Sequence, residues 1–171
     1  YDDGKLLSKT NSFSDTLACV DHLVTSGWFA ADRVGLEGGS AGGLLVGAVL
    51  HLAPDRFRVA HAAVPFVDAL TTMLQPDLPL TVGEWEEWGN PLADPQVYAA
   101  MRAYAPYENL RAEQYPAVLA TSSLHDTRVY VTEPAKWVAR MREVVTNDPA
   151  ARPVLLRTEL SSRQAQLART I

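Results

Sequence analysis

The stretch RVGLEGGSAGGLLVGAVLHL, residues 33–52, decides the fold of this chain. It begins with a short apolar run, Arg33 to Glu37, that is typical of a buried strand. It ends with the segment Leu44 to Leu52, which is apolar enough for a buried helix and is closed by Pro54. Residues 38–43 between them are all small. We therefore predict a strand, a tight turn and a helix, the unit that builds parallel α/β sheets.

The turn reads Gly38-Gly39-Ser40-Ala41-Gly42, which matches the G-x-S-x-G nucleophile elbow. A serine in such a strand-to-helix turn has a strained backbone, and its hydroxyl projects above the sheet. The helix N-terminus beside it favours developing negative charge, and the backbone N–H of Ala41 would supply one donor of an oxyanion hole. The alternative is a glycine-rich turn that only connects a strand to a helix, and the flanking elements favour the elbow.

The rest of the chain continues the alternation of strands and helices. We predict helices over residues 14–26 and 133–145, and strands over residues 58–66, 115–122 and 153–157. Residues 76–96 hold four prolines and few periodic apolar positions, so we predict a long irregular loop there. The alternation predicts an α/β fold, with a mostly parallel sheet and helices on both of its faces.

The composition is that of an ordinary globular domain and excludes several classes of protein. The chain has 171 residues, 47% of them hydrophobic, and its 15 Lys and Arg against 20 Asp and Glu give a net charge of −5. This acidic balance argues against nucleic-acid binding, and no apolar run is long enough to span a membrane. The single cysteine, Cys19, excludes a disulfide within the chain, and without a signal region we expect a cytoplasmic location. The sequence begins at Tyr1 without Met, so we expect a piece of a larger protein.

A serine nucleophile needs a base, and the base needs an orienting carboxylate. On this fold the order along the chain is Ser, then Asp or Glu, then His. Asp126 follows the predicted strand 115–122 and has the position of the carboxylate; the alternative is an aspartate that only caps the next helix. The base is expected after the strand 153–157, where the sequence continues with Ser161, Ser162 and Arg163. All four histidines precede Asp126, and none has a position suited to the base: His22, His51, His61 and His125.

Several separate segments resemble the catalytic domain of the oligopeptidase B group, in the prolyl oligopeptidase family of serine peptidases. These segments are EGGSAGGLLVGAV (37–49), PFVDALTTML (65–74), PLTVGEWEEWGNP (79–91), YPAVLATSSLHDTRV (115–129) and EPAKWVARMRE (133–143). The resemblance extends from Tyr1 to about Leu160. It implies a partial peptidase catalytic domain over residues 1–160, followed by a divergent tail over residues 161–171, which we expect to be a weak helix or a disordered end. The fold it implies is the α/β-hydrolase fold, incomplete at its C-terminal end.

The resemblance assigns roles to individual residues. Ser40 would be the nucleophile, Asp126 the triad carboxylate, and the Ala41 amide an oxyanion donor. Enzymes of this group cleave short basic peptides after Arg or Lys, and the acidic residues that match their specificity residues are Glu84 and Glu86. The two carboxylates suit a guanidinium, which can make two hydrogen bonds at once; the alternative for this segment is a solvated acidic turn. Trp85 and Trp88 either line the pocket or pack the segment, and we favour packing. Arg128 matches an arginine that holds the substrate backbone, and no metal or organic cofactor is implied.

The chain also departs from this family. The Gly-His step that carries the family's catalytic histidine is not found after residues 153–157, and the N-terminal β-propeller of full-length relatives is not among these residues. We expect the boundary or reading frame to depart from the family near Leu160. We therefore predict a serine peptidase by family that has little or no activity as this chain. The alternatives are a non-catalytic remnant or basic-peptide-binding module, and an esterase on the same fold.

Overall fold

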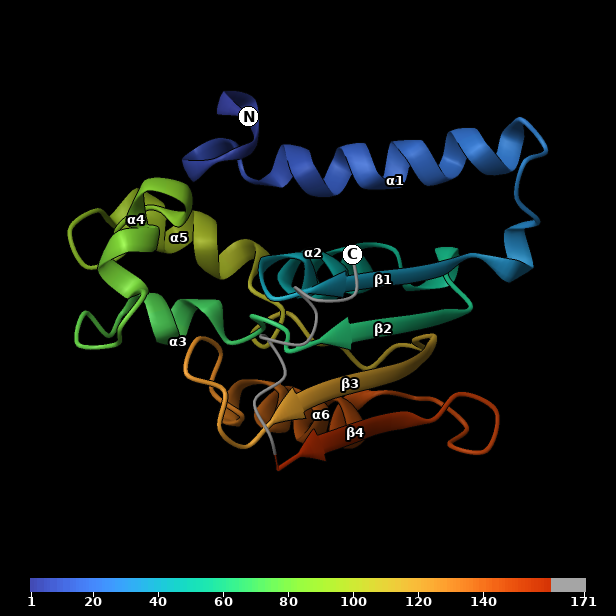
Figure 1. Cartoon of the computed structure of the whole chain (residues 1–171). Helices are drawn as coiled ribbons and strands as arrows, with labels where there is room; N and C mark the ends of the chain where they lie inside the picture. Colours follow the sequence, from blue (N-terminus) through green and yellow to red (C-terminus); the bar gives the residue numbers. More distant parts are fainter. Residues whose placement is uncertain (161–171) are drawn as a thin grey trace.

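Four parallel strands form the centre of the part of the chain that the structure describes, in the spatial order β1-β2-β3-β4 (Figure 1). This computed structural model describes residues 1–160. The strands are β1 (Gly35–Gly39), β2 (Val59–Ala63), β3 (Ala117–Ser123) and β4 (Val154–Glu159). Because all four strands run in the same direction, the loops that follow β1, β2 and β3 meet at one edge of the sheet, where ligands of open α/β sheets bind.

In the described part of the chain, six α-helices accompany the sheet. They are α1 (Thr10–Thr25), α2 (Ala41–Leu52), α3 (Ala69–Met73), α4 (Thr81–Trp88), α5 (Pro95–Tyr104) and α6 (Thr132–Val144). Short 3-10 turns cover Asp2–Gly4, Leu6–Ser8, Ala31–Arg33 and Pro54–Arg56. The helix α2 connects β1 to β2, the helix α6 connects β3 to β4, and α3, α4 and α5 lie together beyond the carboxyl ends of the strands (Figure 1).

The core lies between one face of the sheet and the helices α2 and α6. The strand positions Ala60, Ala62, Val118 and Ala120 share this face by register, and all of them are buried. Right-handed crossovers that advance in one direction across a sheet place their helices on the same face, which explains why α2 and α6 lie together. The opposite face has half-exposed apolar side chains, Val59 and Leu155 among them. The sequence predicts helices on both faces of the sheet, whereas the described residues place α2 and α6 on one face.

The predicted strands and the three predicted helices are all present, with ends that differ by up to four residues. The prediction of a long irregular loop over residues 76–96 is wrong, because this segment contains α4 and the start of α5. Its prolines mark helix ends rather than prevent helices: Pro95 is the first residue of α5, where the Asp94 carboxylate accepts the N–H of Gln96 at 2.8 Å. The short helix α3 is also absent from the prediction.

The tail of residues 161–171, predicted as a weak helix or a disordered end, lies outside the described residues. Within residues 1–160, no helix has both the length and the apolar character needed to cross a bilayer.

Candidate active site

Ser40 occupies a strained turn between β1 and α2, as the nucleophile-elbow motif predicts. Its φ of 54° and ψ of −119° fall in a region that residues other than glycine rarely adopt. Neighbouring backbone groups hold this conformation: the Ser40 N–H donates to the carbonyl of Ala63 at 2.9 Å, and the Ser40 carbonyl accepts the N–H of Phe66 at 3.0 Å. The carbonyl also accepts the N–H of Gly43 at 2.9 Å, which begins the first turn of α2. The end of β2 therefore determines the geometry of the elbow.

Two glycines allow the helix to approach the sheet closely at this turn. A Cβ at Gly38 would lie 2.3 Å from the carbonyl oxygen of Gly42, and a Cβ at Gly43 would lie 2.5 Å from the backbone of Pro65. Both distances are below any real carbon contact, so no side chain fits at either position. At Gly42, in contrast, a Cβ would meet nothing within 4 Å. The motif thus needs its first glycine for space, whereas its last glycine leaves room.

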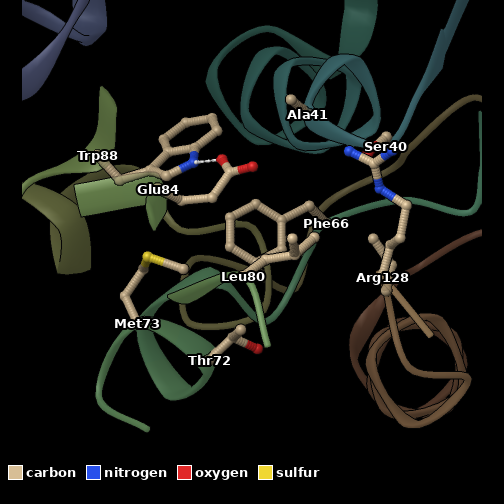
Figure 2. A pocket seen from close by; sticks show the side chains of 10 residues that line it. Ser40, Ala41, Phe66, Thr72, Met73, Leu80, Glu84, Trp88 and Arg128 are labelled. Atoms are coloured by element: carbon tan, nitrogen blue, oxygen red, sulfur yellow. Dashed lines mark hydrogen bonds between the residues drawn. The ribbon is translucent and has the colours of Figure 1, made fainter. Parts of the chain in front are cut away.

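Ser40 opens into a pocket beyond the carboxyl edge of the sheet (Figure 2). The pocket encloses about 400 Å³ of space that is partly open to solvent. Its lining comes from the elbow, the end of β2, α3, α4 and the loop after β3, and comprises Ser40, Ala41, Phe66, Thr72, Met73, Leu80, Glu84, Trp88, Arg128 and Val129. Most of these side chains are apolar, and two of them are charged, Glu84 and Arg128. The pocket therefore suits a ligand that has both an apolar stem and charged groups.

Glu84 places a carboxylate in this pocket. The indole N–H of the buried Trp88, one turn further along α4, donates to Glu84 Oε2 at 2.8 Å. Figure 2 shows the second carboxylate oxygen pointing away from Trp88, toward the open space beside Phe66. The ring of Trp88 also packs against Phe66, with centroids 5.5 Å apart, so this tryptophan both packs α4 and lines the pocket. The local structure thus orients the Glu84 carboxylate toward the pocket.

Glu86, which the resemblance pairs with Glu84, does not line the pocket. Residues two apart on a helix point about 200° away from each other, and the side chain of Glu86 is exposed on the outer side of α4. The acidic segment is a helix rather than the solvated turn that we considered as the alternative.

The third carboxylate of this helix, Glu87, pairs with Lys9 at the start of the chain. The Lys9 ammonium also stands over the ring of Trp88, 4.4 Å from its centroid. Burial alone would raise the pKa of the Glu87 carboxyl, but the adjacent Lys9 ammonium lowers that pKa below its usual range. Sequence reasoning missed Lys9, because 78 residues separate it from Glu87 and no motif includes it.

Asp126 is buried in the loop after β3, at the same sheet edge as Ser40. Its Oδ1 accepts the backbone N–H groups of Arg128 at 2.8 Å and Val129 at 3.1 Å, so it orders the loop before α6 and does not cap that helix, which begins at Thr132. Its Oδ2 is buried and has no hydrogen-bond partner among residues 1–160. A buried acceptor without a donor is unfavourable, and an imidazole N–H is the donor that a triad carboxylate receives.

Arg128 lies beside Ser40 at the mouth of the pocket (Figure 2). Its side chain is exposed, and its guanidinium faces the space above the elbow. This position suits an acceptor group of a bound peptide chain.

The histidines occupy the places that their sequence positions predict. His22 is exposed on α1, and His51 is buried in α2, where burial lowers the pKa of its imidazole. His61 lies on β2 with its Nδ1 at 3.0 Å from Glu37 Oε1 and its Nε2 at 3.2 Å from Thr121 Oγ1. His125 is exposed on the Asp126 loop. No group of three or more His, Cys, Asp or Glu residues in the described part of the chain could hold a metal ion.

Comparison with known proteins places this site in a family. The sequence matches the prolyl oligopeptidase family over residues 1–159. The chain is 48% identical to dipeptidyl aminopeptidase BI of Pseudoxanthomonas mexicana over 95% of its length, and 47% identical to protease 2 of Moraxella lacunata over 86%. These matches span 22% and 21% of the two relatives, so the chain covers about a fifth of their length.

Comparison with solved structures gives the same family as the sequence comparisons. Oligopeptidase B from Trypanosoma brucei, with covalently bound antipain, superposes with a TM-score of 0.89 and 49% identity over 94% of this chain and 22% of that one. Oligopeptidase B from Leishmania major gives a TM-score of 0.88 and 47% identity over 92% of this chain and 21% of that one. The predicted α/β-hydrolase fold and the predicted family are thereby confirmed. The chain belongs to the prolyl oligopeptidase family of serine peptidases and is similar to oligopeptidase B over most of its length.

Proposed function

We propose that this chain carries the nucleophile and the specificity pocket of a peptidase that cleaves after Arg or Lys through an acyl-enzyme on Ser40. The observation that supports the proposal is that Glu84 and Ser40 line one pocket, with apolar walls between them. A guanidinium or ammonium that leaves water for such a pocket requires a carboxylate partner. The aliphatic stem of an Arg or Lys side chain would lie along Phe66 and Trp88, and its charge would reach Oε1 of Glu84, the oxygen that Trp88 does not bind.

The chemistry follows from the elbow. The Ser40 hydroxyl attacks the carbonyl carbon of the basic residue and transfers its proton to a base, and the Ala41 N–H donates to the resulting oxyanion. Collapse of the tetrahedral intermediate breaks the C–N bond, the amine leaves with a proton, and water later hydrolyses the ester. Asp126 would orient the base through Oδ2, and Arg128 would hold an acceptor of the peptide backbone.

We expect catalysis by this chain to be limited by its base, because none of its four histidines has a position suited to the base of the triad. Loss of the histidine of such a triad lowers turnover by about 10⁶, and a residual rate of about 10³–10⁴ over water comes from the oxyanion hole and binding. We therefore expect very slow turnover or none. A chain that binds basic peptides without cleaving them remains the alternative that the same Glu84 pocket supports. An esterase of neutral substrates is disfavoured, since a neutral ester would leave the Glu84 carboxylate without a cation.

Two assays on the purified chain test the proposal. Binding of benzamidine, an aromatic amidinium, is compared with binding of the neutral benzamide, in the wild type and in Glu84→Gln. We expect the wild type to prefer benzamidine by at least about tenfold, since a desolvated charge pair contributes about 1.5–3 kcal/mol, and Glu84→Gln to abolish that preference. The variant Glu86→Gln shows whether the carboxylate on the outer side of α4 contributes to the preference for benzamidine. Equal binding of both compounds by the wild type would contradict a basic specificity.

Turnover is measured with a fluorogenic arginine-amide peptide, with Ser40→Ala as the control and with free imidazole added as a substitute base. We expect imidazole to raise a Ser40-dependent rate, and Asp126→Asn to weaken this rescue. In Asp126→Asn, the side-chain oxygen can still accept the N–H groups of Arg128 and Val129, so the loop is retained. Benzamidine binding without any turnover above Ser40→Ala, with or without imidazole, would favour the binding module.

A further inference from the structure

Two of the segments that carry the family resemblance, residues 65–74 and 133–143, meet through a buried carboxylate. Glu133 lies at the start of α6, and its side chain reaches across to α3. Glu133 Oε2 accepts the backbone N–H of Asp68 at 3.0 Å, and Oε1 accepts the hydroxyl of Thr72 at 2.7 Å. A single carboxylate thus binds the N-cap residue and the fourth residue of α3, a helix too short to be stable alone.

Glu133 is tied to the loop that carries Asp126. The N–H of Glu133 donates to the carbonyl of Tyr130 at 3.0 Å, and the preceding residues of this loop, Arg128 and Val129, line the pocket. Glu133 therefore connects the loop after β3, through its backbone, to α3, through its carboxylate, and both segments line the pocket.

The helix α3 in turn supports α4, which carries Glu84. The Thr81 hydroxyl, at the start of α4, donates to the carbonyl of Thr72 at 3.1 Å. The indole N–H of Trp85 donates to the carbonyl of Met73 at 3.4 Å. Thr72 and Met73 themselves line the pocket (Figure 2). A displacement of α3 would therefore change the pocket wall and the position of Glu84 together.

A second contact strengthens this junction. The Lys136 ammonium, one turn further along α6, pairs with the buried carboxylate of Asp68. Burial raises the pKa of Glu133 to about 7, because the loss of hydration outweighs the hydrogen bonds that its carboxylate accepts. The other titratable or charged groups of this junction are Asp68, Glu108, Lys136, Arg140 and Tyr107. A carboxylate retained in such dry surroundings points to a defined role for its two hydrogen bonds.

We propose that Glu133 is a positioning residue of the specificity pocket, whose carboxylate holds α3 through Asp68 and Thr72 and thereby sets the place of Glu84 relative to Ser40. This inference rests on the proposed function, because it assigns Glu84 to a basic side chain. It adds a residue that touches no substrate. Glu133 would control affinity for the cation through two helices.

Benzamidine affinity of the 171-residue chain tests the inference. We expect Glu133→Ala to lower the affinity by about tenfold, the effect of losing one or two hydrogen bonds that orient the wall. Glu133→Gln should retain it within about twofold, since its carbonyl can accept the Asp68 N–H and its amide can donate to the Thr72 oxygen. Glu143→Ala, which removes an exposed carboxylate from the same helix, is the matched control. Unchanged affinity in a folded Glu133→Ala protein would overturn the inference.

Hydrogen exchange provides a readout that needs no ligand. In Glu133→Ala, we expect the amides of Thr72 on α3 and Glu84 on α4 to exchange about tenfold faster, while Val118 in the sheet keeps its protection. Unchanged exchange on α3 and α4, or a uniform loss that includes the sheet, would overturn the positioning role. If the wild type fails to bind benzamidine, or Glu84→Gln leaves binding unchanged, the proposed function fails, and the exchange experiment still decides the role of Glu133.

Discussion

The indole N–H of Trp88 donates a hydrogen bond of 2.8 Å to Oε2 of Glu84, one helical turn earlier on α4. Because Trp88 is buried against Phe66, this donor has a defined position, and it restricts the carboxylate to one orientation in the pocket. A pocket for a cation gains from such a contact, since a carboxylate that is already oriented loses less side-chain entropy on binding.

Replacing Trp88 by Phe tests this orientation. The phenyl ring keeps most of the packing on Phe66 and removes the donor to Glu84. We expect benzamidine affinity to fall by about five- to tenfold, which corresponds to about 1–1.4 kcal/mol and is the upper part of the range for an ordinary hydrogen bond. Trp85→Phe is the control, because Trp85 donates to the carbonyl of Met73 and not to Glu84. Equal losses in the two variants, measured by titration calorimetry, would argue against a specific role of the Trp88 donor.

The two motif glycines should respond in opposite ways to alanine. Gly38→Ala places a methyl group 2.3 Å from the Gly42 carbonyl, so we expect a destabilisation of about 3 kcal/mol or more by urea unfolding, the level of an overpacked core. Gly42→Ala adds a methyl group in open space within the first turn of α2, where alanine is the better helix former by about 1 kcal/mol. A Gly38→Ala protein as stable as the wild type would show that the strand and helix are less closely packed.

Lys9 should stabilise the fold more than a surface lysine does. Its side chain is largely buried between Glu87 and the ring of Trp88. We expect Lys9→Met to lower the free energy of unfolding by about 1–2 kcal/mol, because it removes an ion pair and a cation–π contact together. The matched variant Lys5→Met also removes an ion pair and a cation–π contact, but with the exposed Asp2 and the exposed Tyr1, and we expect less than about 0.5 kcal/mol. Thermal unfolding at low and high salt compares the two, and equal effects would contradict the prediction.

The raised pKa of Glu133 predicts a pH dependence of stability. Burial raises this pKa from 4.5 to about 7, so the folded chain binds the proton more tightly than the unfolded chain does. The contribution of Glu133 to the free energy of unfolding is therefore complete below about pH 4.5, falls as the pH rises toward 7, and is lost above pH 7. Its size is at most about 3 kcal/mol. The difference in unfolding free energy between the wild type and Glu133→Gln, measured from pH 4 to pH 8, isolates this group. A difference that does not change with pH would show that Glu133 titrates normally.

Much of the fold could be predicted because it depends on residues that are close in sequence. The small residues around Ser40, the apolar run before them and the apolar helix after them identify the elbow, and strands that alternate with helices predict the parallel sheet. The order Ser40 then Asp126 likewise follows from the sequence alone, and the structure places both residues at one sheet edge.

The helix α4 could not be predicted in this way. Its eight residues lack a regular apolar stripe and lie between prolines, and an isolated helix of that length is unstable in water. Contacts with distant residues stabilise it: Trp88 packs on Phe66, and Glu87 pairs with Lys9.

The division between sequence and tertiary structure is clearest in the acidic segment GEWEE. The sequence by itself predicted the elbow at Ser40, because residue type and local spacing determine that feature, whereas only the family resemblance matched the carboxylates of this segment to a basic side chain. Only the tertiary structure decided that Glu84 enters the pocket while Glu86 faces outward. It also brought Glu133 to Asp68, 65 residues apart in the chain. The direction of a side chain depends on how its helix packs, and that packing is set by residues far away in sequence.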